Sequence, residues 1–278
     1  VTRGDERLRQ ELQLIASGRW DQYDQTTRNK KIAAGQPGAV ISLSQHAFTM
    51  RLGALYETSF GLAPFFSYSE SFEPQAGATW DGTPFVPVTG RQYEAGLKYQ
   101  PRGTKAIFTA SIYDLRRRKV PVGDPSAGTN GIPANAQIQI GEVRVRGAEI
   151  EGRGEVAPGI DVILAGSYTD AIITHGTPAT GPTPSTTGTR QLGTPEWAAS
   201  AFLSWDLGRN PRITGPLGGL ELGAGVRYVG GSDGTTTYAI VNGATTFTRF
   251  RTDGFVLVDA LIGYDLGRAL PALDGFQL

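Results

Sequence analysis

The chain has 278 residues, enough for one large domain or two modest ones. Its 26 basic and 26 acidic side chains cancel, which argues against nucleic acid as a partner because such binding usually needs a basic surplus. The absence of cysteine excludes thiolate zinc sites, disulfides and a cysteine nucleophile.

Alternating apolar and polar residues predict the first strands. One covers residues 12–23, and a polar loop over 24–45 separates it from a second over 48–56. A tight turn near 57–61 leads into a third strand over 62–72. After a loop over 73–90, the segment from Tyr93 to Tyr99 alternates most regularly, and its apolar face has an aromatic residue at each end.

The second half of the chain continues this pattern. A short turn at 101–104 precedes a strand that runs from 106 to the triplet Arg116-Arg117-Arg118. A loop over 119–136 rich in Gly, Pro and Asn is followed by a very long strand over 137–155, which turns back at 157–160 into a strand ending near Tyr168. Further strands are predicted over 197–205, 220–228 and 256–264, with loops over 173–189 and 230–251.

About ten long strands with alternately short and long connections predict an all-β antiparallel meander. A soluble sandwich and a transmembrane β-barrel with a wet lumen both give such alternation. Apolar faces of about five alternate residues, their aromatic ends and the alternating connection lengths favour the barrel. The aromatic residues predicted to lie at the membrane interfaces are Trp20, Tyr56, Tyr68, Tyr93, Tyr99, Tyr168, Trp197, Trp205, Tyr228 and Tyr264.

The two ends of the chain predict an internal piece of a longer protein. No signal peptide is visible at the N-terminus, and no apolar run reaches the roughly 18 residues of a transmembrane helix. Because closed barrels avoid free edges, further strands are expected on both sides. A mature protein whose leader has been removed is the alternative.

No catalytic residue and no metal site is predicted. The only histidines, His46 and His175, lie in or beside predicted loops without the acidic partners of a triad or a zinc motif. The pairs Gly218-Gly219 and Gly230-Gly231 lack the pattern of a phosphate-binding loop and predict turns.

The long loops hold the candidate ligand-binding residues. Aromatic rings stack on planar chelator groups, and arginines attract their negative charge. The candidates are Trp80, Phe85, Arg116, Arg117 and Tyr238. Two alternatives stay open: the rings pack within their own loops, and the arginine triplet contacts charged lipid headgroups at a strand end.

An ordered series of motifs resembles TonB-dependent siderophore receptors. The series comprises GRWD at 18–21, LAPFFSYSESFEP at 62–74, GRQYEAGLKY at 90–99, ASIYDL at 110–115, GEVRVRGAEIE at 141–151, SYTDA at 167–171 and GVRYVG at 225–230. The resemblance covers nearly the whole chain and is nearest to ferrichrome-type hydroxamate receptors.

This resemblance implies that residues 1–278 form a partial barrel domain, taken from a barrel of about 22 strands and lacking the plug domain, the TonB box and the terminal strands. It implies a receptor in the outer membrane of a Gram-negative bacterium, surrounded by outer-membrane lipid. This receptor would import a ferric siderophore with energy from the TonB complex, which would contact the missing N-terminal region. The iron chelate would be cargo, so neither a cofactor nor an enzymatic activity is expected. A receptor for cobalamin or haem, a passive porin and a soluble structural or adhesive β-protein are the alternatives.

Overall fold

The computed structural model describes residues 11–28, 40–124, 126–179, 185–241 and 244–268. Ten antiparallel strands form one sheet in which β1 to β9 follow each other in sequence order and β9 pairs with β12. The remaining two strands, β10 and β11, form a separate hairpin. The strands are β1 (Glu11–Arg28), β2 (Val40–Glu57), β3 (Leu62–Glu73), β4 (Val88–Tyr99), β5 (Ile107–Gly123), β6 (Gln137–Ala157), β7 (Ile160–His175), β8 (Trp197–Asp206), β9 (Leu220–Val229), β10 (Ser232–Val241), β11 (Ala244–Thr252) and β12 (Phe255–Tyr264).

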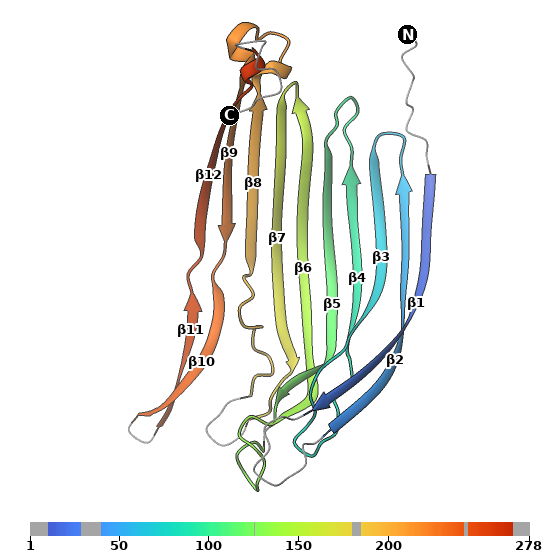
Figure 1. Ribbon diagram of the computed structural model, residues 1–278, viewed down its shortest axis with the longest axis vertical. Coiled ribbons are helices and arrows are strands. Elements are labelled where there is room, and N and C mark those ends of the chain that lie inside the picture. The colour runs from blue at the N-terminus through green and yellow to red at the C-terminus, as the bar shows by residue number, and fades with distance from the viewer. Residues whose placement is uncertain (1–10, 29–39, 125, 180–184, 242–243, 269–278) are drawn as a thin grey trace.

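The connections alternate in length, as predicted. Figure 1 shows the short ones at the upper edge of the sheet and the longer ones at the lower edge; we call these edges the short-turn end and the long-loop end. At the short-turn end, β8 and β9 are joined through two 3₁₀ helices, η1 (Leu207–Arg209) and η2 (Gly215–Gly219), and a third, η3 (Leu266–Arg268), follows β12. No helix in the described part of the chain is long and apolar enough to cross a membrane.

The predicted antiparallel meander of ten strands is confirmed, but two predicted loops were wrong. Residues 230–251 were predicted as a loop and instead contain most of the β10–β11 hairpin. The predicted loop over 24–45 is strand at both ends, because β1 extends to Arg28 and β2 begins at Val40. The extension of β1 over 24–28 is polar on both faces, so it lacks the apolar alternation on which the prediction depended. The extension of β2 does alternate, with Ile41 and Leu43 separated by Ser42, and this short signal was missed.

The sheet has no central apolar core. Among the described residues, no large side chain is less than 2% exposed. The few buried apolar side chains lie near the two ends of the strands: Phe85, Val88, Ala136, Val143 and Ala171 at the long-loop end, and Ala106 and Leu207 at the short-turn end. The strands are therefore held together by their ladders and by contacts between neighbouring side chains rather than by a buried interior.

Candidate functional site

The two faces of the sheet differ in chemistry along its whole width. Side chains at directly paired positions lie on the same face, so one apolar face can be followed from strand to strand. One row on that face runs through Ala54, Phe66, Ala95, Ile112, Ala148, Tyr168 and Trp197. We call this apolar side the outer face and the opposite side the inner face.

Along β4 and β8, the more exposed side chains are the apolar ones, which is the reverse of a water-soluble sheet. Along β4, Tyr93 and Leu97 on the outer face are exposed, whereas Glu94 and Lys98, each the next residue along the strand, are only partly exposed. The same alternation runs along β8, where Leu203 is exposed and Phe202 is less so. Because side chains crowd together on the concave side of a curved sheet, the polar inner face is the concave one. Such a wall suits apolar surroundings outside and water inside.

Aromatic side chains border the apolar band at both ends. All ten aromatic residues predicted at membrane interfaces lie on the outer face. Six form a line near the long-loop end, the loop-end girdle: Trp20, Tyr68, Tyr93, Tyr168, Trp197 and Tyr228. Within this girdle, neighbouring strands bring the rings of Tyr68 and Tyr93 to 5.0 Å between centroids and those of Tyr168 and Trp197 to 4.7 Å. The other four form the turn-end girdle: Tyr56, Tyr99, Trp205 and Tyr264.

Both girdles run obliquely across the hydrogen-bonded rows. From Tyr56 on β2 to Tyr99 on β4, two strands away, the turn-end girdle moves two residues toward the short-turn end relative to the row of directly paired residues. It moves four residues over four steps from Tyr99 to Trp205, and two over two from Trp205 to Tyr264. The loop-end girdle likewise moves eight residues over the eight steps from Trp20 to Tyr228.

An offset of one residue per strand determines the tilt of the strands relative to the membrane normal. With about 3.4 Å per residue and about 4.8 Å between strands, it corresponds to a tilt of about 35°, within the range of membrane barrels. On β8, Trp197 and Trp205 are eight residues apart. At that tilt, the two girdles are about 22 Å apart along the membrane normal, close to the roughly 25 Å apolar band of such barrels.

The inner face carries charges of both signs in mid-sheet. Lys98, Glu151 and Arg227 lie in one hydrogen-bonded row, and Glu149 lies in the next row, within electrostatic reach of Glu94 and Glu151. The ammonium of Lys98 lies 5.5 Å from the centroid of the Phe65 ring. Unburied charges of this kind are stable only beside water, so the inner face is suited to lining a hydrated lumen.

Glycines on the strands make room for aromatic rings on adjacent strands. A Cβ atom at Gly147 would lie 2.5 Å from the hydroxyl oxygen of Tyr113, which itself lies 3.3 Å from the Thr169 hydroxyl oxygen. A Cβ atom at Gly96 would lie 2.7 Å from the ring of Phe65. Both glycines belong to the motifs GRQYEAGLKY and GEVRVRGAEIE. Their role in these motifs is to accept a ring from the neighbouring strand.

The loop between β3 and β4 presents Trp80 and buries Phe85. The amide of Thr79 donates to the carbonyl of Thr83 at 2.8 Å, which closes a turn that leaves Trp80 54% exposed. The Asp81 carboxylate accepts from the Thr79 hydroxyl and from the Thr83 amide, and these hydrogen bonds hold its pKa below the usual range. Phe85 is only 4% exposed, so its ring is not presented to a ligand.

The arginine triplet is divided between the two faces, as a strand requires. Arg117 lies on the inner face near the long-loop end and donates to the Glu73 carboxylate at 2.8 Å. Arg116 and Arg118 lie on the outer face. Tyr238 belongs to β10, but its side chain lies outside the described residues. Of the five candidate ligand-binding residues, the structure thus presents Trp80 and Arg117 at the long-loop end.

No cluster of metal-binding side chains occurs among the described residues. His46 stacks on Trp20 with 5.1 Å between ring centroids, and His175 lies 4.0 Å from the Glu142 carboxylate.

The β10–β11 hairpin was missed although the sequence carries a hairpin signal. The dipeptide Asn242-Gly243 stands between two segments rich in β-branched residues, a strong sign of a hairpin turn.

A ten-stranded antiparallel wall with an apolar outer face, a hydrated inner face and two tilted aromatic girdles defines a section of a transmembrane β-barrel. The family model described as TonB dependent receptor-like, beta-barrel matches residues 7–278. The chain belongs to this family, and the resemblance predicted from its motifs is confirmed. Members of the family are receptors and transporters of the Gram-negative outer membrane.

Curated relatives and solved structures agree with this assignment. The chain is 32% identical over 255 residues to the ferrichrome outer membrane transporter/phage receptor of Escherichia coli K12, covering 92% of this chain and 30% of that protein. It is 31% identical over 226 residues to the ferrioxamine B receptor of Salmonella typhimurium SL1344, covering 81% and 28%. The chain therefore spans about a third or less of these relatives.

Two receptor structures share the fold at lower identity. The siderophore receptor PiuA from Acinetobacter baumannii superposes with a TM-score of 0.70 at 17% identity, covering 92% of this chain and 34% of that one. The ferripyoverdine receptor of Pseudomonas aeruginosa superposes with a TM-score of 0.67 at 20% identity, covering 92% and 30%.

Proposed function

We propose that this chain is part of the barrel of an outer-membrane receptor that imports a ferric siderophore with energy delivered through TonB. The observation that carries the proposal is the family match along nearly the whole chain, together with curated relatives named as ferrichrome and ferrioxamine B receptors. In this proposal the complete barrel has about 22 strands, and residues 1–278 supply ten of them as a partial domain.

The wall has two roles in uptake. Its apolar outer face separates acyl chains from the lumen, and its charged inner face gives the chelate and the rest of the receptor a hydrated path. The receptor makes and breaks no bond in the cargo, so it is not an enzyme. The iron enters as part of the chelate, and the protein needs no resident cofactor.

Trp80 and Arg117 are the proposed ligand contacts within this chain. Trp80 is exposed on a hydrogen-bonded turn at the long-loop end, where its ring is free to stack on a planar chelate. Arg117 extends from the inner face at the same end, where it donates to the Glu73 carboxylate at 2.8 Å, and in this proposal it exchanges that partner for a negatively charged chelate. The buried ring of Phe85 gives no support to the prediction that it contacts the ligand, and the side chain of Tyr238 lies outside the described residues.

Uptake of iron-loaded chelates by a strain lacking the chromosomal gene tests the proposal. Full-length receptor supplied on a plasmid should restore uptake of a ferric hydroxamate and should fail to do so in a strain without TonB. Uptake that persists without TonB would instead indicate a passive pore. Uptake of cobalamin or haem in place of every ferric siderophore would assign another cargo.

Variants locate the ligand contacts. Trp80→Ala should weaken binding of the ferric hydroxamate to whole cells by roughly twofold to tenfold, the loss expected for one aromatic stacking contact. Phe60→Ala is the matched control, because Phe60 is an equally exposed aromatic residue at the short-turn end, 57% against 54%. Equal binding by both variants would remove Trp80 from the site.

A further inference from the structure

Three arginines lie side by side on the outer face, beyond the loop-end girdle. Arg91 on β4 is paired directly with Arg116 on β5, which is paired directly with Arg144 on β6. Like charges directly opposite each other destabilise a sheet. Nearby anions are therefore needed to offset the repulsion between the three guanidinium groups.

Among the described residues, only one of the three arginines has a carboxylate within hydrogen-bond distance. Asp114 accepts hydrogen bonds from Arg144, with Nε 3.1 Å from Oδ2, and from Arg146. Arg116 approaches the same carboxylate only to 3.8 Å, and Arg91 approaches Glu70 only to 3.9 Å. Both distances exceed hydrogen-bond length, so the donors of Arg91 and Arg116 are available to another acceptor.

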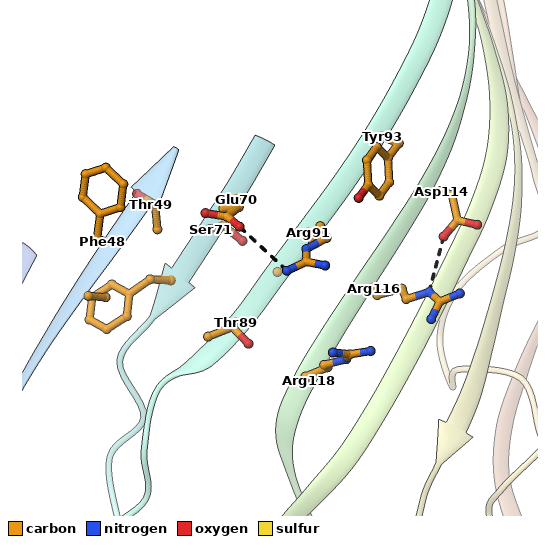
Figure 2. A pocket seen from close by; sticks show the side chains of 13 residues that line it. Phe48, Thr49, Glu70, Ser71, Thr89, Arg91, Tyr93, Asp114, Arg116 and Arg118 are labelled. Atoms are coloured by element: carbon orange, nitrogen blue, oxygen red, sulfur yellow. Dashed lines mark ion pairs between the residues drawn. The ribbon is translucent and has the colours of Figure 1, made fainter. Parts of the chain in front are cut away.

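These two arginines line a groove of about 530 Å³. Figure 2 shows Arg91, Arg116 and Arg118 on neighbouring strands, with Tyr93 and Phe48 in the same groove. Arg118 is already held by Glu142 at 2.7 Å. The groove thus combines two under-compensated guanidinium groups with two aromatic rings that lie on the apolar outer face.

The position of the groove along the membrane normal indicates which part of the lipid bilayer surrounds it. Arg91 lies two residues beyond Tyr93 of the loop-end girdle, toward the long-loop end. At a tilt of about 35°, this places it about 6 Å outside the girdle, at the level of lipid headgroups. The ring of Tyr93 lies between this level and the apolar band, where the upper part of an acyl chain would pack.

We propose that Arg91 and Arg116 bind a phosphate group of an outer-leaflet lipid. The planar guanidinium fork matches two phosphate oxygens, and one phosphate placed between paired arginines would compensate both charges. A lipid fits the groove better than a free anion because its chains would extend past Tyr93 toward the apolar band. This inference rests on the membrane location and not on the siderophore.

Lipid retention by the purified full-length receptor tests the proposal. The receptor in neutral detergent is titrated with bis-phosphorylated lipid A or with the same lipid after its phosphates are removed, and bound lipid is counted by native mass spectrometry. The double variant Arg91→Gln/Arg116→Gln is compared with Arg51→Gln/Arg227→Gln, which removes two arginines from the inner face. Wild-type receptor and the inner-face variant should retain the phosphorylated lipid equally, and the outer-face variant should bind it at least tenfold more weakly.

Several results would overturn the proposal. They are equal retention by the two double variants, equal retention of phosphorylated and dephosphorylated lipid by wild-type receptor, and displacement of the lipid by millimolar inorganic phosphate, which would indicate a site for small anions. If the outer-face double variant does not fold, the comparison of the two lipids on wild-type receptor decides alone. Arg116→Lys, which keeps the charge but loses the fork, should then show an intermediate loss.

Discussion

Ile150 offers the sharpest test of which face meets lipid. Its side chain is 56% exposed on the outer face of β6. The hydrogen-bonded row through Ile150 reaches the loop-end girdle at Tyr228 in three steps, by way of Gly166 and Ala199. In the other direction, it reaches β2 in four steps, at the level of Tyr56 in the turn-end girdle. Ile150 therefore lies close to the middle of the bilayer.

We expect Ile150→Arg to destabilise the receptor by about 2–4 kcal/mol, the cost of an arginine facing lipid at the midplane of a membrane barrel. That corresponds to a loss of roughly 30- to 1,000-fold in the ratio of folded to unfolded protein. Ala148→Arg, two residues away on the same face, should cost only about 0–1 kcal/mol, because Ala148 pairs with the girdle residue Tyr168. Glu151→Gln, on the adjacent inner-face position, should be nearly neutral.

The measurement is denaturant unfolding of the full-length receptor reconstituted in phospholipid vesicles. Tryptophan fluorescence and the mobility difference between folded and unfolded protein on electrophoresis follow the transition. Equal costs for Ile150→Arg and Ala148→Arg would show that the depth assigned from the register is incorrect. A larger loss for Glu151→Gln than for Ile150→Arg would refute the assignment of the two faces.

Three further predictions concern other parts of the wall. Gly147→Ala should destabilise the receptor by about 1–3 kcal/mol in the same assay, because its Cβ would collide with Tyr113 and with the Tyr168 carbonyl; Gly53→Ala, whose Cβ would have 3.7 Å to its nearest neighbour, should not. The lowered pKa of Asp81 means that its carboxylate stabilises the Trp80 turn above the ordinary carboxyl pKa and loses this effect as pH falls through the depressed value. The fluorescence of Trp80, obtained as the difference between wild type and Trp80→Phe, should therefore show an acid transition. The same difference measured in the Asp81→Asn background should show no such transition. Arg209→Ala should cost no more than about 1 kcal/mol despite its contacts with Asp206 and Glu155, because the side chain is 46% exposed, and a larger loss of stability would contradict this.

The sequence predicted the strands well where they cross the membrane and poorly beyond it. Inside the band, lipid on one side and water on the other force alternation, so segments such as Tyr93–Tyr99 identify both the strand and its outward face. Beyond the girdles both faces meet water, and the alternation that would have revealed residues 24–28 is lost, whereas the short alternation of Ile41 and Leu43 with serines was present but was missed. The charged outer-face row was not foreseen, because a cross-strand pair such as Arg91 and Arg116 depends on register, which a single strand does not reveal.

The choice of residue at an outer-face position follows from its depth, and the tilt of the strands makes this visible along single rows. The row that begins at Leu52 on β2 becomes aromatic at Tyr68 and Tyr93, and from β5 onward it is charged: Asp114, Arg146 and Asp170. The next row toward the short-turn end stays apolar as far as Ala148 and reaches the loop-end girdle only at Tyr168 and Trp197. A third stays apolar until Tyr228 on β9. Because each row leaves the membrane at a later strand than the row before it, a flat hydrophobic surface or a protein interface does not explain the pattern, whereas a bilayer crossed by tilted strands does.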